Sequence, residues 1–245
     1  KSVTVTDVDE WDDLEALAKT VNGVIDTAAG RAVSPELTAD GLNALGVAGV
    51  TEDNLDAVVA AIASQVDGTA VDDLAKLTTV VDAAVAAFDN ALAAMTNYAG
   101  DSTDDIGLDS DGAEYAAPSE SQYAALGIDI TGFSDSADLV ASVNTVLASL
   151  PVEGSDVDSA VKVKAIFQAY DAIRTANGQG SLDLDKAAYE ALGLDVAVDF
   201  TVDDAEKVSL LNSVLDAKSM TVGDVDDWSD LEALAKTVKG VIDTA

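Results

Sequence analysis

The chain has 245 residues, neither cysteine nor histidine, and a formal net charge of −34 that comes from 46 acidic and 12 basic residues. This charge argues against nucleic acid and anionic membrane surfaces as partners, because both are negatively charged and the chain has no basic stripe to meet them. Without histidine and cysteine the chain lacks the usual proton shuttle and the strongest nucleophile, so we expect it not to be an enzyme.

The first expected element is an amphipathic helix from Asp9 to Ala28, where apolar side chains recur at helical spacing. The same sequence returns near the end of the chain, since 21 of 25 residues match when Thr4 to Ala28 is laid over Thr221 to Ala245. The offset is 217 residues, which indicates a long repeat that begins a second time. We therefore expect this sequence to be a window from a longer tandem array.

A shorter period lies inside the long one. The tripeptide Ala-Leu-Gly ends at Gly46, Gly127 and Gly193, and an apolar residue follows each copy. Glycine at this place predicts the end of a short helix, because it accepts the left-handed backbone that other residues resist. The expected starts of these short helices are Ser34-Pro35-Glu36, Ser119 to Gln122, and Asp183.

Two further helices are expected in each copy of the shorter period. A middle helix follows Thr51, Ser134 and Thr201, with acidic side chains in its first turn. Later long helices are expected at Val71 to Ala99, Val157 to Ala176 and Trp228 to Thr244.

The predicted fold class is all-α, as an elongated tandem array of three-helix bundle modules. Residues 1–30 form the last helix of a preceding module, and residues 31–100 form the first complete module. Residues 101–178 form a module with an acidic joint at 101–114, and residues 179–245 form the last module.

Aromatic residues are few, and their positions repeat. Trp11 and Trp228 are equivalent, and Val71 and Val157 take their place in the other modules, so we expect packing in a core or between modules rather than an anchor for a carbohydrate or protein. The expected core positions of the short helices are Leu42, Tyr123 and Tyr189.

The joint at 101–114 is the most distinctive local segment. It places six carboxylates within 14 residues, and its Asp-Ser-Asp-Gly stretch offers alternate ligands and a turn to a hard cation such as Ca²⁺. The EF-hand pattern fails, because no glutamate stands at the twelfth loop position, and a solvated linker explains the same residues. Both interpretations stay open, and no other cofactor is expected. The candidate Ca²⁺ ligands are Asp101, Asp104, Asp105, Asp109, Asp111 and Glu114.

The order of a short helix closing in Ala-Leu-Gly, a second helix, and a thread such as Ala217 to Val222 before a long helix resembles the albumin-binding GA module of bacterial surface proteins. It is also similar to the GA-related helical repeats of giant secreted adhesins. The resemblance covers nearly the whole chain in three copies. It implies three-helix bundles, surface display, and a role in adhesion or extension. Albumin binding is not carried over, because the binding residues of that module's second helix have no match here.

Together these features predict a non-catalytic structural spacer or adhesive repeat segment of a large bacterial cell-surface or secreted protein, in an extracellular location. Two alternatives stay open: a repeat or subunit of a self-assembling extracellular filament or surface layer, and a GA-like module that binds a protein ligand. Expected partners are neighbouring modules of the same chain and a host or cell-surface protein. Membrane insertion is not expected, because no run of 18 apolar residues occurs.

Overall fold

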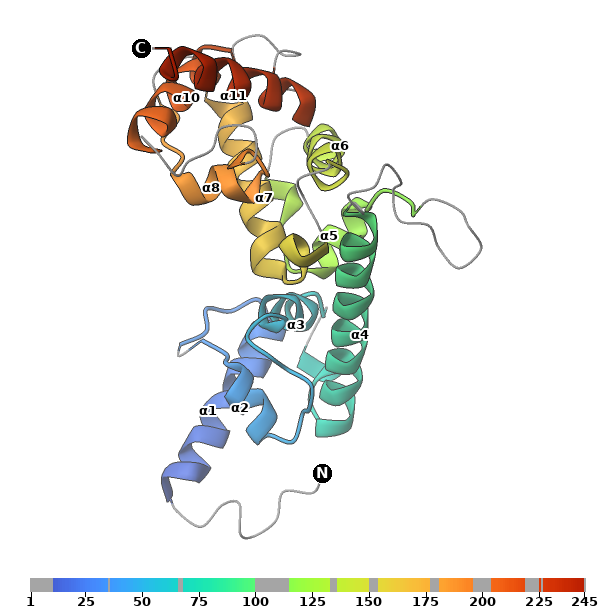
Figure 1. Cartoon of the computed structure of the whole chain (residues 1–245). Coiled ribbons are helices and arrows are strands. Elements are labelled where there is room, and N and C mark those ends of the chain that lie inside the picture. The colour runs from blue at the N-terminus through green and yellow to red at the C-terminus, as the bar shows by residue number, and fades with distance from the viewer. Residues whose placement is uncertain are drawn as a thin grey trace. The chain divides into compact units, whose positions relative to one another are not determined.

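The described part of the chain is helical throughout (Figure 1). The computed structural model describes residues 11–34, 36–65, 68–99, 115–132, 136–149, 154–176, 181–195, 204–218, 225 and 227–244. No strand occurs among these residues. The expected all-α class is therefore confirmed.

The helices follow the order expected from the apolar periodicity. The short and middle helices are α2 (Ala39–Ala44), α3 (Leu55–Ala63), α5 (Glu120–Ala125), α6 (Ser136–Leu147), α8 (Lys186–Ala191) and α10 (Asp204–Lys218). The long helices are α1 (Trp11–Ala28), α4 (Leu74–Tyr98), α7 (Ala160–Thr175) and α11 (Trp228–Ile242). Three 3₁₀ turns complete the described elements: η2 (Gly68–Ala70), η3 (Ile130–Gly132) and η4 (Gly154–Val157).

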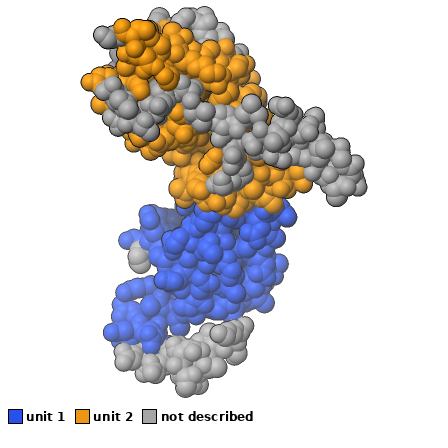
Figure 2. Space-filling model, viewed as in Figure 1, with its two compact units in different colours: residues 1–91, 121–128 blue, residues 92–120, 129–245 orange. Residues whose placement is uncertain are grey.

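The chain divides into two compact units, which Figure 2 shows in different colours. Unit 1 contains Lys1–Ala91 and Ser121–Ile128, and unit 2 contains Leu92–Glu120 and Asp129–Ala245. This division rests on spatial contacts and differs from a division by sequence repeat. The module boundaries after residues 30, 100 and 178 stay predictions.

Unit 1 has a small aliphatic core. Helix α1 contacts α2, α3 and η2, and the core also takes in the beginning of α4. Its most buried side chains are Leu42, Val47, Val58, Ile62 and Val81. A core of this composition follows from a chain that is rich in aliphatic residues and has only 4% aromatic ones.

Unit 2 adds aromatic side chains to the same kind of packing. Helix α7 contacts α6 and α8, while α11 contacts α10 and α6. Phe167, Tyr170 and Tyr189 are fully buried here. Together with Tyr123 and Leu42, which are equally buried, Tyr189 confirms the three core positions predicted for the short helices.

The three Ala-Leu-Gly copies end their short helices in the same way. Gly46, Gly127 and Gly193 have φ angles of 94°, 76° and 70°, which lie in the left-handed region. The amide that follows each glycine donates to the carbonyl five residues earlier, at 3.2, 3.2 and 3.0 Å, as in a Schellman motif. The donors are the buried Val47, Ile128 and Leu194. The predicted role of glycine at this place is confirmed.

Two of the expected helix starts are wrong by a few residues. Helix α2 begins after Thr38, whose Oγ1 accepts a hydrogen bond from the amide of Gly41 at 3.1 Å, and not near Ser34-Pro35-Glu36. Helix α8 begins after Asp185, whose Oδ1 accepts from the amide of Ala188 at 2.9 Å, and not after Asp183. In both cases the start is set by the side chain that reaches an otherwise unpaired amide three residues on.

Among the described helices, α4 alone is long and apolar enough to cross a membrane by length and composition. Its apolar side chains Leu77 and Val81 belong to the core of unit 1. Its exposed carboxylates, Asp82 and Asp89, would each oppose insertion by about 2.5–3.5 kcal/mol at the bilayer centre. The helix is thus explained as a core helix, and the absence of membrane insertion stays a prediction.

Candidate functional site

The predicted Ca²⁺ ligands lie outside the described residues, so the structure places none of them. They are Asp101, Asp104, Asp105, Asp109, Asp111 and Glu114. Within the described ranges, no group of three or more acidic side chains is arranged to hold a metal ion. The Ca²⁺ site and the solvated linker stay alternative predictions for this joint.

A calcium titration separates these two alternatives. If the joint binds Ca²⁺, millimolar CaCl₂ is expected to raise the melting temperature of the chain, because a ligand that binds the folded state stabilises it by mass action. The double substitution Asp109→Asn and Asp111→Asn should remove this response, whereas Asp82→Asn on α4 should keep it. Identical melting curves with CaCl₂ and with chelator would leave the solvated linker as the explanation.

Aspartate at the start of α11 has a structural role. The Asp227 carboxylate accepts hydrogen bonds from the Ser229 hydroxyl at 2.6 Å and from the Asp230 amide at 3.1 Å. The hydrogen bond from the Ser229 hydroxyl is the main cause of the lowered pKa of Asp227; burial opposes it, and the backbone amides of Asp230 and Ser229 lower the pKa further. The stabilisation by this cap is present above the unfolded pKa near 4 and is lost as the pH falls through the lowered value. Asp227 is therefore the N-cap of α11.

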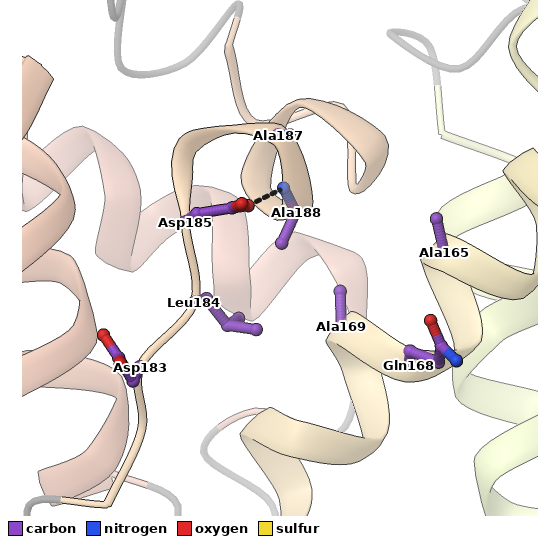
Figure 3. Close-up of a pocket in the computed structure, with 8 residues that line it drawn as sticks. All are labelled: Ala165, Gln168, Ala169, Asp183, Leu184, Asp185, Ala187 and Ala188. Atoms are coloured by element: carbon purple, nitrogen blue, oxygen red, sulfur yellow. Dashed lines mark hydrogen bonds between the residues drawn. The ribbon is translucent and has the colours of Figure 1, made fainter.

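A shallow hollow of about 390 Å³ lies beside α7 and α8 (Figure 3). Gln168 reaches it from α7, and Asp183 and Asp185 reach it from the segment before α8. Asp185 is already engaged as the cap of α8, and the three polar side chains do not converge in this view. The remaining lining is small and apolar, which does not resemble a site where groups are aimed at a substrate.

A buried polar network lies behind this hollow and fixes the entry into α8. The Asn212 side chain of α10 accepts from the Tyr189 hydroxyl at 2.7 Å and from the Leu184 amide at 3.1 Å. Its Nδ2 donates to the Leu184 carbonyl at 2.8 Å. One amide side chain thus ties a middle helix to a short helix and to the chain that precedes it.

The same bond recurs one module earlier. Asn144 of α6 donates from Nδ2 to the Pro118 carbonyl at 2.9 Å. Pro118 stands five residues before Tyr123, as Leu184 stands five residues before Tyr189. This pair of asparagines was not predicted from the sequence, although an Asn directly after the buried Val143 and Leu211 in two middle helices was a visible signal.

Burial raises the pKa of Tyr189 well above the ordinary tyrosine value of about 10. The folded chain therefore keeps this proton at a pH where the unfolded chain loses it. The free energy of unfolding should fall above pH 10, by up to about 1.4 kcal/mol per pH unit for this group. Tyr189→Phe should reduce that slope in urea unfolding between pH 8 and pH 11, and an unchanged slope would contradict the prediction.

An exposed apolar surface lies on α1 between Trp11 and Val21. Trp11, Leu14, Ala18 and Val21 follow one another at helical spacing on one side, and we call them the open face of α1. Trp11 is 77% exposed, Leu14 51% and Val21 43%. An apolar hollow of about 200 Å³ continues from Val21 to Leu74 of α4, whose side chain is also exposed. An exposed apolar stripe of this kind marks an interaction surface.

The equivalent tryptophan in α11 has different surroundings. Trp228 donates from its ring Nε1 to the Leu192 carbonyl at 2.9 Å, and its amide donates to Thr145 Oγ1 at 3.0 Å. The expected packing role is therefore confirmed for Trp228. Trp11 is not part of a core among the described residues, because its side chain is 77% exposed, and its packing between modules stays a prediction.

Comparisons with protein-family models, with curated proteins and with solved structures gave no match to this chain. The resemblance to GA-like modules rests on the residues named above and stays a proposal.

Proposed function

We propose that this chain is a structural spacer or adhesive repeat segment of a large bacterial cell-surface or secreted protein, built as an elongated tandem array of three-helix modules without catalytic activity. The observation that carries the proposal is the repeated tie between a middle helix and the chain before a short helix. It joins Asn144 to Pro118 and Asn212 to Leu184. Repeated units with the same internal tie are suited to supply length and spacing.

The first module has apolar residues at the positions of this tyrosine and asparagine, and this further supports the proposal. There Leu42 stands where the others have Tyr123 and Tyr189, and Val59 stands where they have asparagine. Leu42 is fully buried and Val59 packs partly buried against the same core. The apolar pair replaces the hydrogen-bonded pair, so the same packing position is filled without a buried polar group that lacks a partner.

The acidic surface fits an extended extracellular segment. Several described lysines pair with a carboxylate four residues away, as in Lys19 with Glu15, Lys162 with Asp158 and Lys236 with Glu232. Exposed pairs of this kind contribute little to stability, so most of the negative charge stays at the surface. Such a charge keeps a long chain soluble and discourages collapse of one module onto another.

Small-angle X-ray scattering tests the proposed shape. A compact body of this length has a radius of gyration of about 18 Å, and we expect a clearly larger value for an array of modules. A radius of about 18 Å at physiological salt would contradict the proposal.

The open face of α1 also favours a second candidate, a self-assembling filament or surface layer. An exposed patch that fits a different surface of the next copy generates open polymers. Sedimentation velocity over a hundredfold range of concentration distinguishes the candidates, because a spacer keeps one sedimentation coefficient and a filament subunit does not. A serum-protein pull-down separately tests the ligand-binding alternative.

A further inference from the structure

One helix sequence occurs twice in this chain, and its two copies bury opposite halves. In α11 the first half is covered: Leu231, Ala235 and Val238 are buried, and Trp228 is hydrogen-bonded through its ring. In α1 the equivalent residues form the open face. The side chains are identical at these positions, so the difference comes from their surroundings alone.

The second halves show the reverse. Val24 of α1 is 2% exposed and Thr27 is buried, while the equivalent Val241 of α11 is 55% exposed and Thr244 is exposed. The equivalent glycines Gly23 and Gly240 differ in the same way. A Cβ added at Gly23 would lie 2.8 Å from Leu37 Cδ2 and 3.4 Å from Val33 Cγ1, whereas nothing lies within 4 Å of a Cβ added at Gly240.

Helix α7 shows what such a helix looks like when both halves are in use. It contacts both α6, which precedes it in the chain, and α8, which follows it. Its buried side chains run from the first turn to the last, and they include Ala160, Val163, Phe167, Tyr170 and Ile173. Each half of a long helix thus has a place in the packing of this fold.

We propose that the Trp11–Ala28 helix sequence is a joint shared by two neighbouring copies of the repeat. Its first half docks in the copy before it, in a cleft like the one that α11 occupies against α10, α6 and Leu192. Its second half docks in the copy after it, against residues equivalent to Val33, Leu37, α2 and α3. The occupant of the open face of α1 is therefore a second copy of this chain's own repeat, placed end to end with it.

The shared joint also explains why α11 has a glycine at position 240, where no neighbour in this structure requires one. Glycine inside a helix is less favourable than most residues, and Gly240 contacts nothing that requires its small size. At Gly23 the same glycine makes room for Leu37. The repeat retains at Gly240 a space that the next copy fills.

The inference rests on the proposed end-to-end array and is tested by continuing the repeat. A duplicated chain carries Lys1–Ala245 followed directly by residues 29–245, which keeps the period of 217 residues. In the single chain, Gly240→Gln should raise the melting temperature by about 2 °C, because a good helix former replaces glycine at an open position. Gly23→Gln should lower it, because the new side chain displaces Leu37.

In the duplicated chain the effect of Gly240→Gln on the melting temperature should be reversed, so that the substitution lowers it as Gly23→Gln does. A rise of similar size in both chains would overturn the shared joint. It would leave the array itself standing if scattering still shows an extended particle, so the two proposals fail separately.

A binding measurement on the full-length chain keeps the inference testable if the duplicated chain does not fold. Leu231→Asp is expected to release α11 from its cleft, and a labelled synthetic peptide of residues 4–28 should then bind with an affinity within tenfold of a peptide of residues 221–245. A peptide of residues 4–28 with Leu14→Asp should bind at least tenfold more weakly. No binding by the unsubstituted 4–28 peptide, or equal binding by both 4–28 peptides, would overturn the proposal.

Discussion

Replacing Leu231 by aspartate is expected to lower the free energy of unfolding of unit 2 by about 3–5 kcal/mol, because the substitution buries a charge without a partner. Leu231 is fully buried on α11, which packs against α10 and α6. The chain is expected to respond by releasing α11.

The matched control is Leu14→Asp on α1. The nine residues from Asp13 to Val21 are identical to those from Asp230 to Val238, so helix propensity and local charge cancel between the two substitutions. Leu14 is 51% exposed, and its substitution should change the free energy of unfolding by less than about 0.5 kcal/mol. Urea unfolding followed by circular dichroism measures the free energy of unfolding of both variants. Equal losses would contradict the finding that Leu231 is buried and Leu14 exposed.

The second large effect is expected at Asn212. Asn212→Val leaves the amide and carbonyl of Leu184 and the hydroxyl of Tyr189 without this partner, and we expect a loss of about 2–4 kcal/mol. The loss should appear as a lower urea midpoint with an unchanged slope, since the exposed area on unfolding stays the same.

A double-mutant cycle with Tyr189→Leu isolates the contribution of the phenol. The double variant places apolar residues at the positions that Leu42 and Val59 occupy in the first module. We expect it to be more stable than the sum of the single losses by about 1–2 kcal/mol, because removing both partners leaves fewer buried polar groups unpaired. Strictly additive losses would contradict the coupling of Tyr189 with Asn212.

The periodicity of apolar residues was enough to predict the helices and the core positions of the short ones. Leu42, Tyr123 and Tyr189 could be aligned because each precedes an Ala-Leu-Gly ending by the same spacing, and the helix must then turn at the glycine. The starts of α2 and α8 were less predictable. Several Ser, Thr and Asp residues precede each of them, and only the folded backbone decides which side chain reaches a free amide.

The candidate surface could not have been predicted from sequence in the same way. Leu14 and Leu231 have identical neighbours along the chain, yet one is exposed and the other buried, so the difference arises entirely from tertiary contacts. Val161 shows the same effect in α7, because the helix buries Ala160 and Val163 but leaves this valine 69% exposed. Asn144 and Asn212 were overlooked because polar residues beside an apolar stripe are ordinarily solvated.

The central claim is that copies of the repeat follow one another end to end, and the radius of gyration of the duplicated chain tests it most directly. An array of modules predicts a radius close to twice that of the single chain, because length is added along one axis. A compact body predicts a ratio of only about 1.3, from the scaling of radius with chain length in globular domains. A ratio near 1.3 would contradict the account, and a ratio near two is the result that it predicts.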